Sequence, residues 1–158
     1  MAGTWGKCDF KQLKELQKRI EKLQKADLDE FCKTVSKELA ARLLAKVIKR
    51  TPVGQYPASS GKVGGTLRRG WTGETQQNAK SYAESLPVIQ KGNSYEITIK
   101  NPVEYASYVE FGHRTRNHKG WVEGRFMLTK SEMEVEGQAQ KIIEKKLLDY
   151  FGEVFNDK

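Results

Sequence analysis

The sequence predicts an α+β fold in which an antiparallel β-sheet of three to four strands packs against two long amphipathic helices, N-terminal and C-terminal, with one short helix. Apolar residues recur at spacings of three and four over residues 28–50 and again over 125–155, which is typical of helices that bury one face. Residues 95–100 alternate between apolar and polar, as a strand does, directly after the turn residues Gly92 and Asn93. Strands that follow one another between helices are typical of a sheet with helices on one face.

The length of 158 residues suits one domain. We expect residues 1–9 to form a flexible N-terminal arm and residues 10–158 to form a single α+β domain with mobile loops at 52–66 and 112–124. Long segments without regular structure are usually functional or mobile, and the first of these loops is rich in glycine and serine.

The N-terminal helical region divides into two predicted helices. The first starts at Phe10 and alternates apolar residues with lysines. Asp27 can cap the second helix, with Glu30 at the capping-box position. The second helix should stop near Arg50, because Pro52 disfavours the helical conformation of the residue before it.

The middle of the chain is predicted to hold the sheet. Strands are expected at 66–74, at 82–90 and at 95–100, with the second weakened by an internal proline. Asn101 can cap a short helix over 102–112, with Pro102 at the first helical position and a glycine at the end. Residues 121–122 can add a short edge strand before the C-terminal helix.

The residues that could carry chemistry form no recognisable site. The two histidines, His113 and His118, have the neighbours Arg114, Arg116 and Lys119, which repel a metal cation. The serines and cysteines show no nucleophile-elbow pattern and no base partner. We therefore expect no catalytic residue, no cofactor, no metal and no enzymatic activity.

Other candidate motifs also have simpler explanations. The glycine-rich residues 61–66 lack the phosphate-loop pattern and follow a loop instead of a strand. The carboxylates at 27–30 and at 132–136 suit the first turns of two helices, where negative charge is favourable. Cys8 and Cys32 form neither a disulfide framework nor a zinc pattern, which fits a reducing compartment.

The charge distribution is the most informative surface property. Lys plus Arg number 28 against 20 Asp plus Glu, a net charge of +8. Residues 46–69 carry only positive charges, residues 112–130 are mostly basic, and residues 132–158 are mostly acidic. Such polarity suits subunits that meet head to tail, or a surface that faces a phosphate backbone. The residues expected to face a partner or DNA are Arg114, Arg116, His118, Lys119, Lys62, Arg68 and Arg69.

Three segments together resemble a known family. They are residues 49–54, residues 65–71, and residues 101–114 followed by 124–128. This combination is similar to the small tailed-phage proteins encoded between the portal and the major tail genes, known as head–tail joining, neck or tail-completion proteins. The likeness spans about residues 40–130, and this chain differs from the family in a longer link after Gly54. The resemblance implies structural roles for the motif residues Pro52, Leu67, Trp71, Asn101, Tyr105, Ala106, Glu110 and Gly112.

The resemblance also implies a function and partners. It implies a structural virion protein that assembles as a ring at the head–tail junction and has no catalytic residues. Its expected partners are copies of itself and other connector or tail proteins, with packaged DNA nearby. Neither a membrane nor a small-molecule substrate is expected, and the protein should occupy the virion and, during assembly, the host cytoplasm.

Two alternatives remain open at this point. A tail terminator that caps the tail tube has the same class of function with a different partner. A basic nucleic-acid-binding module would use the positive charges together with aromatic side chains such as Trp71, Tyr82, Tyr95 and Trp121, although Trp71 and Tyr95 also suit the core.

Overall fold

The computed structural model describes residues 14–15, 17–18, 21, 28–75 and 77–156. The predicted N-terminal arm, most of the predicted helix that starts at Phe10, and the predicted cap Asp27 lie outside the described residues.

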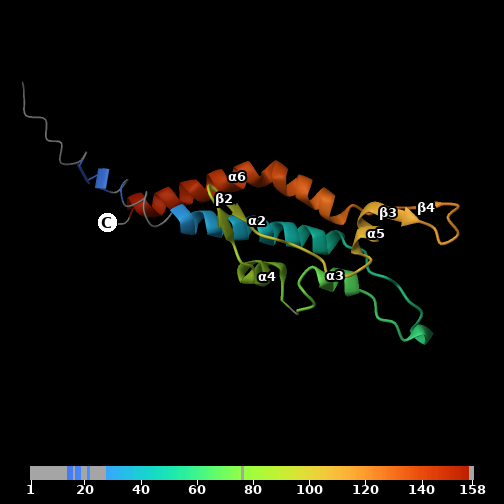
Figure 1. The fold of residues 1–158 in the computed structure, drawn as a ribbon. Coiled ribbons are helices and arrows are strands. Elements are labelled where there is room, and N and C mark those ends of the chain that lie inside the picture. Colours follow the sequence, from blue (N-terminus) through green and yellow to red (C-terminus); the bar gives the residue numbers. More distant parts are fainter. Residues whose placement is uncertain (1–13, 16, 19–20, 22–27, 76, 157–158) are drawn as a thin grey trace, which may run out of the picture.

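Two long antiparallel helices run along the length of the molecule (Figure 1). They are α2, Leu28–Arg50, and α6, Met127–Asn156, and both confirm the helices predicted from apolar spacing. The start of α2 faces the end of α6, where the rings of Phe31 and Tyr150 lie 5.2 Å apart. At the other end, the Arg50 guanidinium donates to the Ser131 hydroxyl at 2.7 Å.

The C-terminus of α2 lies where the sequence predicts it. The Thr51 amide donates to the Val47 carbonyl at 2.9 Å, and the Thr51 hydroxyl donates to the same oxygen at 2.6 Å. Pro52 then prevents the helix from continuing. Thr51 is completely buried, so its hydroxyl becomes part of the core.

The prediction of a strand at 66–74 is wrong, because this segment contains the helix α3, Thr66–Gly70. Leu67 and Trp71 are the two large apolar residues of this segment. A spacing of four residues places two side chains on the same side of a strand and also on the same side of a helix. Both side chains are buried as predicted, but from a helical turn.

The prediction of a strand at 82–90 is also wrong over most of its length. Residues Ala79–Ser85 form the helix α4, and only Ile89–Lys91 form a strand, β1. The Asn78 side chain accepts a hydrogen bond from the Ser81 amide at 2.9 Å, which caps α4 in the usual way.

The chain has mixed helix and strand structure, but the expected single sheet is absent from the described residues. Strand β1 pairs with β2, Ser94–Glu96, through the predicted turn at Gly92 and Asn93. Strand β3, Gly112–Arg114, pairs separately with β4, Trp121–Glu123, which confirms the predicted edge strand. The expected third strand stops at Glu96, so residues 97–100 pair with none of the strands in the described ranges.

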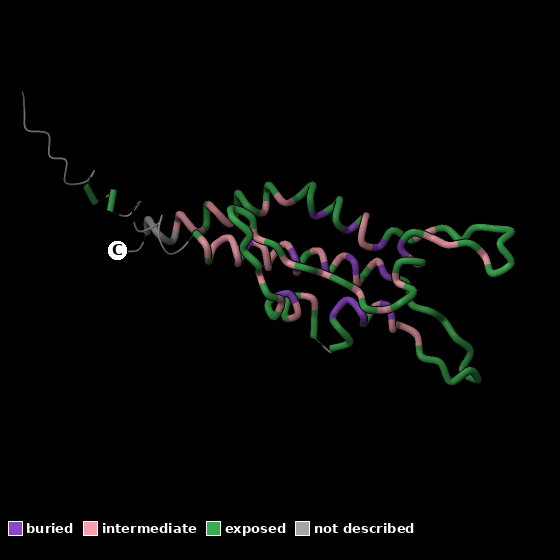
Figure 2. Tube along the Cα trace, in the orientation of Figure 1, coloured by how far each residue is buried: buried purple, intermediate pink, exposed green. Residues whose placement is uncertain are grey.

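The core was expected to form between helices and a sheet, but its buried residues come mainly from helices. A short helix α5, Ala106–Phe111, lies beside the start of α6 (Figure 1). A single 3-10 turn, Ala58–Ser60, interrupts the loop between α2 and α3. Figure 2 shows that the buried positions lie in the central part of the molecule. The buried cluster consists of Ala40, Leu44, Val47, Leu67, Trp71, Ala83 and Met127.

An ion-pair cluster joins the two long helices. Glu134 accepts from Lys46 at 2.9 Å and also pairs with Arg50. The helix α6 starts at Met127, so the expectation that the carboxylates at 132–136 occupy its first turn is wrong. Glu134 is positioned instead by cations of α2.

We expect this cluster to make stability depend on pH. The hydrogen bonds from Lys46 and then Arg50 hold the pKa of Glu134 below its ordinary value of 4.5. Its ionised form therefore stabilises the folded state above that value, and the contribution is lost as pH falls through the lowered pKa. The free energy of unfolding, measured in urea from about pH 5 to about pH 3, should fall less for Glu134→Gln than for the unaltered protein. Parallel pH profiles for the two proteins would contradict this account.

Candidate interaction surface

Two segments extend from the same end of the molecule, on either side of α5 (Figure 1). One is the loop 52–65, and the other is the β3–β4 hairpin. We refer to residues 52–65 and 105–123 as the projecting end. Most of its residues are exposed, in contrast to the buried centre (Figure 2).

Buried hydrogen bonds fix the base of the loop 52–65. The Trp71 indole donates to the Thr51 hydroxyl at 2.8 Å. The Arg68 guanidinium donates twice to the Thr51 carbonyl, at 3.2 and 2.7 Å. Thr51 thus joins α2 to α3 directly before the loop begins.

Asn101 provides a second link to α3. Its side-chain amide donates to the Leu67 carbonyl at 2.8 Å, and its side-chain oxygen accepts from the Val103 amide at 3.1 Å. A Cβ atom at Gly70 would lie 2.3 Å from that oxygen, so only glycine fits here without movement. Asn101 was expected to cap the short helix, but α5 starts five residues later and Asn101 instead holds α3.

Glu110 fixes the base of the hairpin by capping α6 from another helix. Its carboxylate accepts from the amides of Leu128 and Thr129, each at 2.9 Å, and from the Thr129 hydroxyl at 2.8 Å. Phe126, which precedes α6 with φ 51°, has no side-chain acceptor of its own. A buried carboxylate at the positive end of a helix satisfies amides that otherwise lack partners.

The hairpin leaves α5 through Gly112, whose φ of 85° favours glycine. At the tip, the Thr115 amide donates to the Gly120 carbonyl at 3.0 Å, and the Thr115 hydroxyl accepts from the Gly120 amide at 3.0 Å. The Lys119 amide donates to the Asn117 side chain at 3.2 Å. This segment, predicted to be a loop, is thus a hydrogen-bonded hairpin; its mobility stays a prediction.

The opposite loop is narrow at its base and open further out. A Cβ atom at Gly64 would lie 2.0 Å from the Gly54 carbonyl oxygen, so the two backbones touch. The Lys62 ammonium lies 5.9 Å from the centre of the Tyr56 ring. A cavity of 230 Å³ separates the base of the loop from Tyr105 and Val109 of the α5 region.

Large apolar side chains are exposed across the projecting end. Tyr108 is 59% exposed and Phe111 is 61% exposed. The short helix was expected to bury Tyr105, Ala106, Tyr108 or Val109 against the sheet. Ala106 and Val109 do pack against the core, whereas both tyrosines face outward. The other exposed apolar residues of this end are Val53, Tyr56, Val63, Tyr105, Trp121 and Val122. Exposed apolar groups that gather in one region are typical of protein contact sites.

The predicted partner-facing residues divide into three groups. Arg114, Arg116, His118 and Lys119 are exposed together on the hairpin, and Lys62 is exposed on the opposite loop. Arg69 is exposed at the base. Arg68 is half-buried and bound to Thr51, so it stabilises the base, and the sequence alone gave no sign of this role.

The motif residues lie in α3 and α5 and in the segments next to them. Leu67, Trp71 and Glu110 are buried, and Asn101, Ala106 and Gly112 are half-buried. Pro52 and Tyr105 are exposed. Sequence reasoning missed Thr51, the hydrogen-bonding centre of this region, because a threonine at a helix end has no distinctive pattern.

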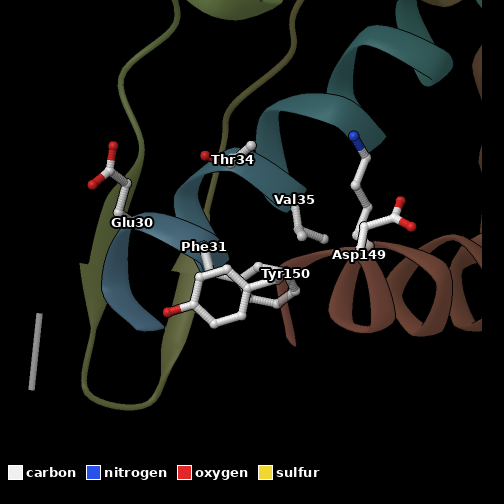
Figure 3. A pocket seen from close by; sticks show the side chains of 7 residues that line it. Glu30, Phe31, Thr34, Val35, Asp149 and Tyr150 are labelled. Carbon is white, nitrogen blue, oxygen red and sulfur yellow. The ribbon is translucent and has the colours of Figure 1, made fainter. Parts of the chain in front are cut away.

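Far from the projecting end, α2 and α6 enclose a cavity of 390 Å³ (Figure 3). Its described lining includes the neighbouring rings of Phe31 and Tyr150, whose planes are tilted by 38°, with the Glu30 carboxylate on one side and Asp149 on the other (Figure 3). No histidine or cysteine is among these lining residues.

No three His, Cys, Asp or Glu side chains in the described part of the chain gather as a metal site requires. No helix within the described ranges is long and apolar enough to cross a membrane.

Comparison with known proteins identifies the family. A family model described as "Bacteriophage HK97-gp10, putative tail-component" matches residues 14–112, which is more than half of the chain. The matched region includes α2, the loop 52–65 and every motif residue from Pro52 to Gly112. No curated protein and no solved structure gives a significant match. The chain belongs to the HK97-gp10-like family of bacteriophage tail components.

Proposed function

We propose that the protein is a structural subunit of the phage head–tail junction, a neck or tail-completion protein that assembles as a ring and helps to join the DNA-filled head to the tail. Membership of a tail-component family supports a structural, non-enzymatic role in the virion. The observation that carries the finer proposal is the projecting end, where two anchored segments expose aromatic and basic side chains around α5.

The construction of this end suits docking to other proteins. The bonds of Thr51 and Glu110 hold the bases of both segments, so little conformational freedom is lost there when a partner binds. Aromatic and arginine side chains are the residue types that contribute most to protein interfaces. The partners we propose are other copies of the chain and the connector or tail proteins above and below the ring.

Electron microscopy of particles assembled without this protein tests the proposal. We expect DNA-filled heads and finished tails of normal length that remain separate, and joined particles after the protein is supplied. Tails of irregular length would instead identify a tail terminator. Normal joined particles would contradict both roles.

A nucleic-acid-binding role has one specific observation in its favour. Arg114, Arg116 and Lys119 are exposed on the hairpin, and none forms an ion pair with a described residue. If the hairpin faces packaged DNA, affinity for duplex DNA should fall steeply with salt, by about one power of salt concentration for each phosphate contact. Replacing Arg114 and Arg116 with glutamine should reduce that dependence.

A further inference from the structure

The segment Ile97–Lys100 has the pattern of a strand but no strand partner. Ile97 and Ile99 are half-buried, while Thr98 and Lys100 are exposed, which is the alternation of an extended chain. Among the described residues, no hydrogen bond joins the backbone of this segment to another. Such an edge offers unpaired N–H and C=O groups to a strand from outside. We refer to Ile97–Lys100 as the open edge.

The open edge borders an apolar groove. The groove has a volume of 350 Å³ and lies between the open edge, α2 and α6. Its apolar lining includes Leu39, Leu43, Ile97, Ile99, Val135 and Ala139. A second cavity of 230 Å³ shares Ile99 with it and reaches the exposed ring of Phe111. The apolar lining thus continues along the whole open edge.

Two carboxylates stand at the rim of this groove. Glu132 and Glu136 are one helical turn apart on α6, and both are exposed. Neither forms an ion pair with a described residue, whereas Glu134 between them is held by Lys46 and Arg50. The groove therefore combines an apolar floor, an unpaired backbone edge and free negative charge.

The β3–β4 hairpin has the complementary properties. Trp121 and Val122 of β4 are 55% and 44% exposed, and β3 is the only strand that pairs with β4 in the described part of the chain. Arg114, Arg116 and Lys119 provide positive charge beside it. The hairpin extends away from the body of its own subunit (Figure 1), so it is available to another molecule.

Building on the proposed ring, we infer that the β4 strand of one copy pairs with the open edge of the next copy. Successive side chains of a strand point to opposite faces, so one of Trp121 and Val122 covers the apolar groove, and the basic residues of the hairpin lie near Glu132 and Glu136. Addition of a strand to an exposed edge is a common mode of recognition, and charge complementarity fixes its orientation. Because donor and acceptor are different surfaces, the contact is heterologous, as a closed ring requires.

A proline substitution tests the backbone part of this contact. Thr98→Pro removes one N–H from the open edge, at an exposed residue whose amide has no partner among the residues that the structure describes. We expect association, measured by sedimentation, to weaken about tenfold or more, with the urea unfolding midpoint of the monomer unchanged. Association as strong as that of the unaltered protein would overturn the pairing.

Charge reversal tests which surfaces meet. Glu132→Lys with Glu136→Lys should weaken association about tenfold or more, and so should Arg114→Glu with Arg116→Glu. A chain that carries all four changes should regain association, because opposite charges face each other again. The matched control is Glu144→Lys, an exposed carboxylate further along α6 and outside the groove, which should have little effect.

The outcomes separate this inference from the proposed function. If the unaltered protein forms rings but the combined charge reversal does not restore association, the proposed ring is kept and the inferred contact between β4 and the open edge is rejected. If the hairpin reversal abolishes binding to duplex DNA and leaves association intact, the hairpin faces nucleic acid and the inference fails. A protein that never associates, alone or with tail components, overturns both. Association that Thr98→Pro and the charge reversals leave unchanged, while removal of residues 1–27 abolishes it, assigns the contact to that segment.

Discussion

Replacing Trp71 with alanine is expected to lower the free energy of unfolding by about 3–5 kcal/mol. The side chain is 4% exposed and packs within the buried cluster formed by α2, α3, α4 and α6. Its indole also donates to the Thr51 hydroxyl, which would lose a buried partner. A loss of this size is a large part of the total stability of a domain, about 5–15 kcal/mol. Urea denaturation followed by circular dichroism measures it.

The same substitution at an exposed tryptophan is the control for Trp71. Trp121 is 55% exposed, so Trp121→Ala should change the free energy of unfolding by less than about 0.5 kcal/mol. Trp71→Phe should fall between the two, because it keeps an aromatic ring in the core and loses the hydrogen bond. Equal effects at Trp71 and Trp121 would mean that the helical core described here is wrong.

Replacing Glu110 with alanine is expected to cost about 2–3 kcal/mol. The change removes all three hydrogen bonds that the carboxylate accepts at the start of α6, two of them from the amides of Leu128 and Thr129. No side chain at Phe126 can replace the cap. Urea denaturation should show the loss, and the α5–α6 junction that carries the hairpin should become more susceptible to proteases.

Two controls separate the cap from a general effect of charge. Glu104 is exposed and precedes α5, so Glu104→Ala should be neutral within about 0.5 kcal/mol. Glu110→Gln keeps one acceptor oxygen and should cost less than Glu110→Ala. If Glu104→Ala and Glu110→Ala were equally mild, the carboxylate would not be capping α6.

The parts of the fold that sequence alone predicts are those with a long repeating pattern. Over the 23 residues of α2 and the 30 residues of α6, the helical period has many repeats with which to distinguish itself from a strand. The segment 66–74 offers only Leu67 and Trp71, whose spacing suits both structures. The alternation of 95–100 predicts a strand over the whole segment, but the strand ends at Glu96, because pairing is a tertiary property that no local pattern specifies.

The sequence predicts the charged residues of the candidate surface, but not the groove or the role of every basic side chain. Clustered charge in the sequence identifies Arg114, Arg116 and Lys119, which the hairpin does bring together. Arg68 belongs to the same charged stretch and is nevertheless bound to Thr51, because the folded backbone places a carbonyl within its reach. The groove beside Glu132 and Glu136 combines residues more than 90 positions apart, such as Leu39 and Val135, so it exists only after folding.

The central claim is that this tail component assembles with copies of itself and with junction proteins. The most direct test is its mass in solution by light scattering, alone and with purified connector or tail proteins, at two salt concentrations. The account predicts a discrete ring, or a complex that forms only with a junction protein, and higher salt should weaken it because charged surfaces meet. The account would be contradicted by a protein that stays monomeric with every junction component and whose mass increases only when duplex DNA is added at low salt.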